Sequence, residues 1–387
     1  MLDVYSRASS RYARGRAAGG ASGAEDWLVR LDPGFATRRA HPLRVGLFVP
    51  TSGAAGIWGP STIACARLAA AELNDAGGVL GREVILQVVD AASENPLLLR
   101  QTRQLLADNQ IDAIVGMHLS SVRKALLPAA AGRVPYVYTP LYEGGERHPG
   151  VFTLGETPLH QLVPALAALS ERRTPTRWAL IGNDYVWPRI SHRYAREVLR
   201  RLRCPIVQEA FLPLGCNDFQ PTVDRLAQSG AQAVLLSLIG QDAVDFNRAF
   251  AASGLPGRVR RLSCAIEENE LLAIGADHTE ELYVAGSYFA TLATEANLAF
   301  RERYHSHLRA RAPTLNGLGQ STYEGVHFLA ALVSRASGPP RPGEPLRFRS
   351  ARGAVWRGND RLTCPVFLAR AEGHALEVVR TLSASGD

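Results

Sequence analysis

The hydrophobic pattern of this chain begins with a short apolar run at residues 45–49, a Gly-rich loop at 51–56 and a segment at 61–73 with apolar residues at helical spacing. A continuous apolar run of about five residues is typical of a strand buried on both faces of a parallel sheet. The spacing of the third segment predicts an amphipathic helix, which ends at Gly77 and Gly78. The first unit is therefore a strand, a loop and a helix.

The same unit recurs through the first two thirds of the chain, in two series. In the first series we expect strands at 83–89, 113–116 and 136–138, and helices at 97–106 and 121–130. In the second we expect strands at 178–181, 206–212, 233–238 and 261–264, and helices at 191–202, 218–229 and 242–252. Strands that alternate with helices form parallel sheets with right-handed crossovers. Two series predict two sheets.

The last third of the chain starts no third series. Its pattern indicates a strand at 282–286, helices at 295–308 and 318–336, a Pro- and Gly-rich stretch at 338–343, and alternating strands from 348 onward. The simplest interpretation is that these segments complete the two sheets already begun. The chain would then cross between two lobes several times, and the crossings would form a hinge.

The predicted fold class is α/β, with two Rossmann-like lobes of parallel sheet flanked by helices. The predicted parts are a flexible Arg-rich arm at 1–43, a first lobe at 44–156 plus 287–345, and a second lobe at 157–286 plus 346–387.

The charge of the chain is concentrated at its start. Of the net charge of +7 over 387 residues, the first 44 residues hold eight Arg against four acids. The body is therefore nearly neutral, which argues against direct nucleic-acid binding. No apolar run is long enough to span a membrane. The first forty residues also lack the apolar stretch of a secretory signal, which predicts a cytoplasmic protein, with a periplasmic one as the alternative. Five scattered cysteines favour reduced thiols.

The motifs of common α/β enzymes are missing from the sequence. The segment 77–82 ends a helix and is no Walker A loop, and neither G-x-S-x-G nor an early G-x-G-x-x-G occurs. His305 and His307 are two positions apart on a predicted helix, so their rings face different sides and do not suit a metal. We therefore expect a binding protein without cofactor or metal, and an enzyme on this fold is the weakest alternative.

Polar and aromatic residues gather where predicted strands end, which is where open parallel sheets bind ligands. The segment 116–124 runs from a strand through His118 into Ser120 and Ser121, one of which is placed to cap the next helix. The free N–H groups of such a helix start bind hydrogen-bond acceptors. An ordinary helix cap is the alternative interpretation.

Two more strand ends carry candidates of this kind. The turn at 138–142 presents Tyr138 and Tyr142, and the loop at 182–189 carries Asp184, Tyr185 and Trp187. Aromatic residues in a polar loop favour the walls of a pocket, whereas Asp184 alternatively caps the next helix. Glu267 follows a later strand, where its carboxylate either compensates a helix dipole or faces a cleft.

From about residue 44 to 370, the chain resembles the type I periplasmic-binding-protein superfamily, especially the branch with the cytoplasmic amide sensor of amidase operons. The landmark shared with the whole superfamily is the helix end at 72–82. Segments that resemble the amide and urea branch are Arg123-Lys124, Tyr142-Glu143-Gly144 and the 184–189 run, and Arg352-Gly353-Ala354-Val355 is a further landmark of the resemblance.

The resemblance implies three hinge crossings and a ligand held in the cleft between the lobes. It implies that Ser120 hydrogen-bonds the ligand, that Tyr138 and Thr139 line the same wall, and that Tyr185 or Trp187 closes over it. His118, Trp187 and the Gly240-Gln241-Asp242 segment depart from the sensor, so a pocket of different shape is expected. The candidate ligand-binding residues are Ser120, His118, Ser121, Tyr138, Thr139, Leu141, Tyr142, Asp184, Tyr185, Trp187, Gln241 and Glu267.

A cleft that grips a neutral amide must satisfy one carbonyl and one NH2 group, a task that suits hydroxyls and backbone amides. An amino acid would instead need a carboxylate for its ammonium group, which Glu267 or Asp184 could supply. The first hypothesis is a homo-oligomeric cytoplasmic sensor of a short amide that acts through an RNA-binding antiterminator. The alternative is the solute-binding component of an ABC transporter, with a permease as partner, for urea, amides or branched-chain amino acids.

Overall fold

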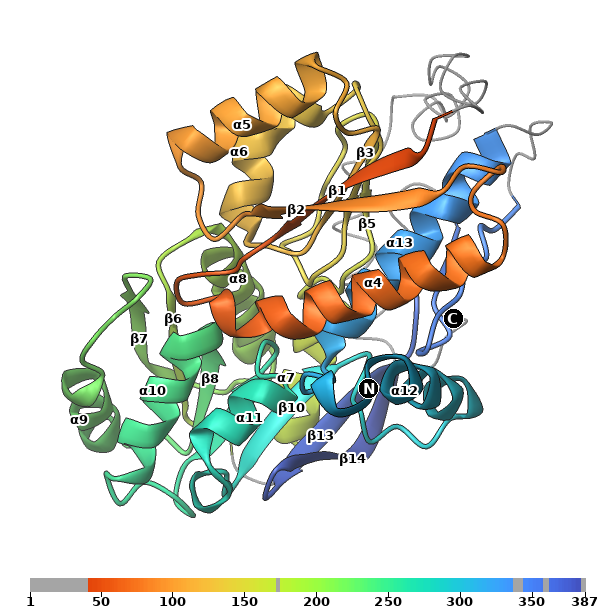
Figure 1. Ribbon diagram of the computed structural model, residues 1–387. Coiled ribbons are helices and arrows are strands. Elements are labelled where there is room, and N and C mark those ends of the chain that lie inside the picture. The colour runs from red at the N-terminus through yellow and green to blue at the C-terminus, as the bar shows by residue number, and fades with distance from the viewer. Residues whose placement is uncertain (1–40, 172–174, 337–343, 358–361, 384–387) are drawn as a thin grey trace.

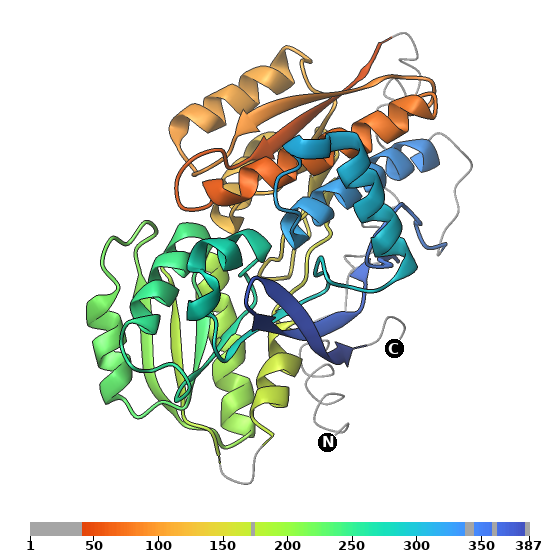
Figure 2. The same cartoon turned by 60° about the horizontal axis from the view of Figure 1, so that its bottom comes forward.

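The computed structural model describes residues 41–171, 175–336, 344–357 and 362–383. Figures 1 and 2 show two lobes, one above the other, with the end of β10 and the segments that follow β5 and helix α13 running between them. The predicted N-terminal arm, apart from its last three residues, lies outside the described residues. All five cysteines lie within them and are free thiols.

The first lobe is built on five strands, β1 (Leu43–Val49), β2 (Val84–Asp90), β3 (Ala113–Gly116), β4 (Tyr136–Tyr138) and β5 (Val151–Thr153). They form a parallel sheet in the order β2-β1-β3-β4-β5. β3 and β4 are buried at every residue, as expected for strands covered on both faces. The continuous apolar runs of the sequence are therefore explained by helices on both sides.

The helices of the first lobe are α4 (Gly59–Asp75), α5 (Pro96–Ala107), α6 (Ser120–Ala130), α12 (Glu295–Leu308) and α13 (Gly317–Ala336). Short 3-10 helices precede α4 (η2, Gly56–Trp58) and follow α12 (η4, Arg309–Arg311). In Figure 1, α4 and α13 lie side by side on one face of the sheet, and α5 and α6 pack together on the other. Most of α13 is buried, because it fills the space between α4 and the sheet.

The second lobe has seven strands, β6 (Trp178–Asn183), β7 (Ile206–Leu212), β8 (Ala233–Ser237), β9 (Arg260–Ser263), β10 (Leu282–Gly286), β13 (Val366–Glu372) and β14 (Ala375–Ser383). Their order is β14-β13-β10-β9-β8-β6-β7. The first five are parallel, whereas β13 and β14 form an antiparallel hairpin added at the edge. The sheet is thus mixed, where the sequence predicted a parallel one.

The helices of the second lobe are α7 (Leu162–Leu169), α8 (Val186–Arg201), α9 (Gln220–Gln228), α10 (Gly240–Ala251) and α11 (Glu268–Ile274). A 3-10 turn, η3 (Ala276–His278), follows α11, and a small hairpin of β11 (Val355–Trp356) and β12 (Leu362–Thr363) precedes β13. No helix in the described ranges is both long and apolar enough to span a bilayer.

The predicted α/β fold class is confirmed, and most predicted strands and helices agree with the structure to within two residues. β5 and α7 were missed, since three residues and a short run of leucines and alanines carry little periodicity. Helix α8 begins at Val186, not at residue 191, because Pro188 is tolerated in the first turn of a helix. Trp187 therefore lies on a helix, and its predicted place in a loop is wrong.

In the part of the chain that the structure describes, three segments run between the sheets, namely residues 154–161, 287–294, and 344–357 together with 362–365. Part of the third crossing packs against the first lobe. Phe348 and Trp356 pack edge-on against Phe328 of α13, and Trp356 also contacts Phe152 of β5. Residues 346–356, which the sequence assigned to the second lobe, thus contact the first.

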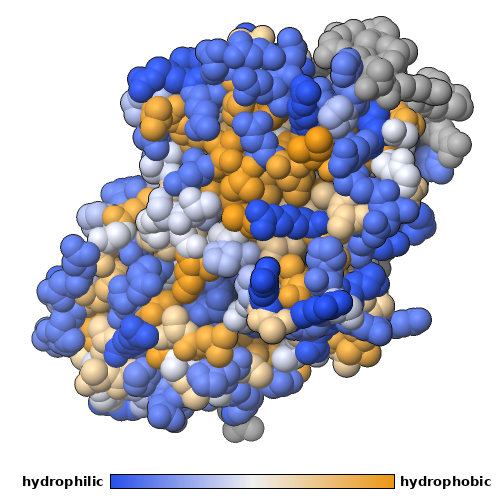
Figure 3. All heavy atoms as spheres, viewed as in Figure 1, coloured by the Kyte–Doolittle hydropathy of each residue, from blue (hydrophilic) through white to orange (hydrophobic). Residues whose placement is uncertain are grey.

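Apolar side chains gather on the face of the first lobe shown in Figure 3, around β2 and α4. β2 is an edge strand, and its Ile85 and Val88 are exposed, as is Leu97 at the start of α5. An open strand edge with exposed apolar residues is a place where another chain can pair. The expected homo-oligomer stays a prediction.

Candidate functional site

A cavity lies between the lobes, where the C-terminal ends of both sheets face each other. Its first-lobe wall comes from η2, from the β3–α6 and β4 strand ends and from α13, with the residues Trp58, Met117, His118, Leu119, Ser120, Tyr138, Pro140, Leu141 and Leu318. Its second-lobe wall consists of Tyr185, Trp187, Ile239 and Ala265. Open α/β sheets bind ligands at this end of their strands. The cavity therefore lies at the end of the strands where a binding site is expected.

The lobes touch each other around this cavity. The backbone N–H of Gln241 donates to the carbonyl of Ala54 at 2.9 Å, and Asn269 donates to the carbonyl of Ile57 at 2.9 Å. The cavity is small in this arrangement, with about 20 Å³ of room for a water-sized molecule. Since bonds join the two lobes directly, the structure represents a closed arrangement.

His118 is buried and both of its ring nitrogens have partners inside the first lobe. Nδ1 lies 3.1 Å from the carbonyl oxygen of Leu119, which only accepts, so Nδ1 carries the proton. Nε2 then accepts from the hydroxyl of Tyr136 at 2.9 Å. Burial lowers the pKa of His118 to about 4, although the bond to the Leu119 carbonyl opposes this shift. His118 is therefore neutral near pH 7. Because both of its ring nitrogens already have partners, it lines the cavity without donating a hydrogen bond to a ligand.

Ser120 and Tyr138 place hydroxyl groups together at the cavity. The Tyr138 hydroxyl donates to the carbonyl of His118 at 2.7 Å, so it has no further proton to donate to a ligand. The Ser120 hydroxyl lies 3.4 Å from the Tyr138 oxygen, a long contact that a better acceptor would replace. Ser120 is thus free to donate to a ligand.

Helix α6 presents its N-terminus to the same place without a side-chain cap. Its N-cap residue is Leu119, which has extended backbone and no capping hydrogen bond. The predicted serine cap is wrong, since Ser120 is the first residue of the helix. The uncapped N–H groups and the helix dipole favour an acceptor or a partial negative charge here.

The second lobe contributes a pair of aromatic rings. Tyr185 and Trp187 stand at the start of α8 with ring centroids 6.4 Å apart. No described residue hydrogen-bonds the Tyr185 hydroxyl or the Trp187 indole N–H. Among the described residues that line the cavity, none is charged, because His118 is neutral. The walls of the cavity thus combine aromatic and aliphatic side chains, and its free polar groups are mainly donors.

Comparison with known proteins decides the family. The family model described as "Periplasmic binding protein" matches residues 42–372, which is most of the chain. This chain belongs to the periplasmic binding protein family. The match covers both lobes and every residue that lines the cavity.

Solved structures of solute-binding proteins share this fold. One from R. palustris, in complex with 4-hydroxybenzoate, is 20% identical with a TM-score of 0.79 over 89% of this chain and 98% of that chain. A branched-chain amino acid transporter substrate-binding protein from Streptococcus pneumoniae, in complex with isoleucine, is 17% identical with a TM-score of 0.76 over 87% and 99%. At such identities the likeness shows the fold.

Six of the twelve candidate residues from the sequence line the interlobe cavity of this periplasmic binding protein: His118, Ser120, Tyr138, Leu141, Tyr185 and Trp187. The other six lie outside it. Ser121 is on the outer side of α6, where its hydroxyl donates to Glu94 at 2.9 Å. Asp184 is exposed and pairs with Arg189 at 2.6 Å. The Gln241 side chain is also exposed and donates to Asp245 at 2.9 Å.

Three further candidates, Tyr142, Thr139 and Glu267, lie close to the cavity without lining it. Tyr142 packs edge-on against Tyr138, with centroids 6.4 Å apart. Thr139 is buried against Thr322 of α13. Thr139 and Glu267 line a second cavity of similar size toward the hinge, which shares Pro140, Leu141 and Leu318 with the first. Glu267 is the N-cap of α11 and forms a capping box with Glu270, and it also lines this second cavity, so it serves the helix end and faces the cleft at once.

Sequence reasoning missed several wall residues. Trp58 follows the Gly-rich loop after β1, so the strand-end rule that selected the other segments could have found it. Ile239 and Ala265 also follow strands, but small and aliphatic residues give no chemical signal. Leu318 is at the start of α13, and its place depends on how the last third of the chain returns to the first lobe.

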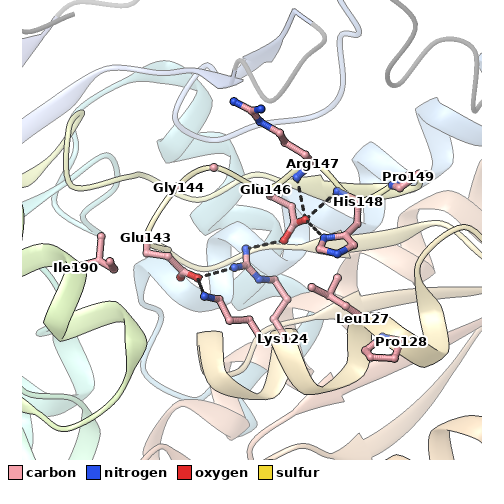
Figure 4. A pocket seen from close by; sticks show the side chains of 12 residues that line it. Lys124, Leu127, Pro128, Glu143, Gly144, Glu146, Arg147, His148, Pro149 and Ile190 are labelled. Atoms are coloured by element: carbon pink, nitrogen blue, oxygen red, sulfur yellow. Dashed lines mark hydrogen bonds and ion pairs between the residues drawn. The ribbon is translucent and has the colours of Figure 1, made fainter. Parts of the chain in front are cut away.

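A wider depression lies elsewhere on the first lobe and is shown in Figure 4. It is open and lies between α6, the loop 143–149 and Ile190 of α8. Beneath it Arg123 is buried, with Nη2 2.8 Å from Glu143 and Nη1 3.4 Å from Glu146. Lys124 and His148 approach the same two carboxylates (Figure 4). Since Arg123 and Lys124 already pair with these carboxylates, the interlobe cavity is the better candidate for a ligand site.

Arg123 links that depression to the cavity wall. Its guanidinium lies 4.9 Å from the ring centre of Tyr138 and 5.1 Å from that of Tyr142. Burial alone would lower the pKa of Arg123, but Tyr138, Glu143 and Glu146 more than offset this and raise it. Arg123 is therefore a charged support that fixes the ring of Tyr138 from outside the cavity.

The first turn of α11 holds the lobes together with carboxyl groups. Glu270 accepts from the indole N–H of Trp58, Glu268 accepts from the N–H of Ala290 at 2.7 Å, and Glu267 accepts from the N–H of Gly317 at 2.6 Å. Trp58 and Gly317 belong to the first lobe and Ala290 to the second crossing, so these bonds connect α11 to parts of the chain outside the second-lobe sheet. Burial raises the pKa of Glu268 to about 7 and that of Glu270 to about 8, although the hydrogen bonds oppose the shift.

We expect the closed, folded protein to lose stability as the pH rises. Both carboxyls have a pKa above the ordinary value of about 4.5, so the folded form binds more protons than the unfolded chain. Their contribution is full below about pH 4.5 and is lost as the pH rises through 7 and 8. The melting temperature should fall between pH 5 and pH 8.5, and Glu270→Gln should reduce that fall. The exposed Glu302→Gln is the control, and an unchanged profile in Glu270→Gln would contradict the assignment.

Proposed function

We propose that this protein is the solute-binding component of an ABC transporter and closes on a small planar molecule that carries a carbonyl or carboxylate oxygen. The observation that carries the proposal is the interlobe cavity, whose walls include the rings of Tyr185 and Trp187 and whose free polar groups are donors. Flat rings stack well on Tyr185 and Trp187, and an oxygen fits the uncapped start of α6 beside Ser120. The ligand class is therefore an aromatic carboxylate or amide.

The cavity argues against a free amino acid. An ammonium group that leaves water needs a carboxylate or several acceptors, because an unpaired buried charge is very unfavourable. Asp184 is exposed and bound to Arg189, and Glu267 is occupied by the N–H of Gly317 in the neighbouring cavity. With no charged side chain among the described lining residues, an ammonium ion has no partner.

The related structures support a transported solute of this kind. The R. palustris protein holds 4-hydroxybenzoate, an aromatic carboxylate, and the S. pneumoniae protein holds isoleucine. The aromatic walls favour the first type of ligand for this chain. As part of a transporter the protein would act on the outer side of the membrane and deliver its ligand to a permease.

A cytoplasmic amide sensor that controls an antiterminator is the second candidate. It is favoured by one observation, the neutral state of His118 in a cavity without charge, which suits a neutral amide. A carboxylate would rely on the α6 N-terminus alone for its charge. The ligand therefore separates the two candidates: tight binding of a benzoate favours transport, and selective binding of a short aliphatic amide favours the sensor.

Calorimetric titration against 4-hydroxybenzoate, benzamide, acetamide, urea and isoleucine tests the proposal. We expect the two aromatic ligands to bind, and isoleucine to bind at least about tenfold more weakly because its ammonium group stays unpaired. Trp187→Ala should weaken the aromatic ligands and leave the fold intact by circular dichroism. Preferred binding of isoleucine would overturn the ligand class.

For Ser120→Ala we expect weaker ligand binding by about 1 kcal/mol, the usual contribution of one hydrogen bond. Ser121→Ala is the matched control, because this neighbouring hydroxyl faces Glu94 outside the cavity. Titration of both variants with the best ligand of the panel gives the comparison. Equal affinity of Ser120→Ala and the wild type would remove Ser120 from the site.

A further inference from the structure

One buried guanidinium joins all three segments that cross between the lobes. Arg352 lies on the third crossing with its side chain only 2% exposed. Its Nη2 donates to the carbonyl of Leu154 at 2.9 Å, and Nη1 donates to Glu156 at 2.9 Å, both on the first crossing. Nη1 also donates to the hydroxyl of Ser287 on the second crossing. The hinge therefore has a single centre.

The remaining donors of Arg352 anchor this centre to the first lobe. Nε and Nη2 both lie 2.9 Å from Glu324 of α13, which is fully buried. Four of the five N–H donors of the guanidinium thus form hydrogen bonds, and its charge pairs with Glu324, an arrangement that suits the planar group of Arg. Burial would lower the pKa of Arg352, but Glu324 and Glu156 raise it, so the group stays charged.

The bonds at Ser287 are the ones that connect this centre to the end of a strand in the second-lobe sheet. Leu154, Glu156 and Glu324 follow or belong to elements of the first lobe, whereas Ser287 directly follows β10 of the second-lobe sheet. Glu156 also accepts from the backbone N–H of Ser287 at 3.1 Å. A rotation between the lobes changes the position of Ser287 relative to the other three residues. Arg352 and Glu156 together therefore hold Ser287 in its closed position.

We infer that Arg352 is the positioning residue of the hinge. Through Ser287 and Glu156 it stabilises the arrangement that the three crossing segments have in the closed form, and it thereby sets how often the lobes close. The inference rests on the proposed closure around a ligand but not on the identity of that ligand. It assigns a role to the Arg352-Gly353-Ala354-Val355 segment, which does not contact the ligand cavity.

The test measures closure without any ligand. Ala54→Cys and Gln241→Cys place two thiols on residues that are joined by a backbone hydrogen bond across the cleft. With diamide as oxidant, the rate at which they form a disulfide reports how often the lobes close. The single-cysteine variants correct for the partly exposed Cys216 and Cys364.

In this background we expect Arg352→Lys to slow trapping by about fivefold or more, the factor of one lost hydrogen bond. Ser287→Ala, which leaves the Arg352–Glu324 pair intact, should slow it in the same direction. Arg261→Lys is the matched control, because Arg261 is equally buried but bonds Asn247 and Glu280 within the second lobe. It should lower the melting temperature without slowing the trapping.

Two results would overturn the inference. One is trapping at the wild-type rate in both Arg352→Lys and Ser287→Ala, which would leave Arg352 a merely structural residue. The other is equal slowing in Arg261→Lys, which would make slow trapping a general effect of instability. Failure of the ligand panel would disprove the proposed ligand class and leave these rates unaffected, so the two failures are distinguishable.

Discussion

Gly240→Val is expected to reduce ligand affinity by about a hundredfold or more, because it blocks the closed form. Gly240 is the first residue of α10 and has φ +52°, and a Cβ at this position would lie 2.0 Å from the carbonyl oxygen of Ala54. That oxygen belongs to backbone of the opposite lobe, so no side chain can move aside. In an open arrangement the two backbones separate and the clash disappears. Each lobe should therefore fold.

The control for Gly240→Val separates the blocked contact from backbone strain. Gly254 has φ +70°, and a Cβ there would meet no atom within 4 Å. Gly254→Val thus carries similar left-handed strain without the interlobe clash. We expect it to lower the melting temperature and to keep its ligand affinity. Equal loss of affinity in the two variants, measured by calorimetry, would contradict the closure mechanism.

Arg123→Met is expected to lower the free energy of unfolding by about 3–5 kcal/mol, the usual cost of removing one partner of a buried ion pair. Glu143 and Glu146 would stay buried, with Lys124 beside the first and His148 and two backbone N–H groups beside the second. The ring of Tyr138 would also lose its charged support. Chemical denaturation followed by fluorescence measures the change, with the midpoint as readout if the two lobes unfold separately.

Two further variants show whether charge causes this loss. Adding Glu143→Gln and Glu146→Gln to Arg123→Met removes the unpaired carboxylates and should restore part of the stability. Arg189→Met breaks the exposed pair with Asp184, which should cost about 1 kcal/mol or less. If Arg123→Met were no more destabilising than Arg189→Met, the buried ion pair would have no structural importance.

The sequence predicted the fold because its signals are local. Apolar runs such as 113–116 and 233–238 mark buried strands, and a helix follows each of them. The strand-end rule then selected Ser120, Tyr138 and Tyr185 for the site, and the structure brings them to one cavity. These residues were predictable because the ends of parallel strands meet at one edge of a sheet.

What the sequence could not predict depends on the direction of side chains and on distant pairing. Ser120 and Ser121 are neighbours on one helix, but only the first faces the cavity, because α6 begins one residue earlier than expected. Asp184 turns to solvent because Arg189 lies within reach on α8. The role of Arg352 depends on three crossings far apart in the chain, and no local pattern reports their meeting.

Closure of two lobes around a small molecule is tested most directly by small-angle X-ray scattering with and without the best ligand of the panel. The radius of gyration should fall when the ligand saturates the wild-type protein, and it should stay constant in Gly240→Val at the same ligand concentration. A ligand that binds Gly240→Val and Trp187→Ala as tightly as the wild type, with unchanged scattering, would contradict binding in the interlobe cavity.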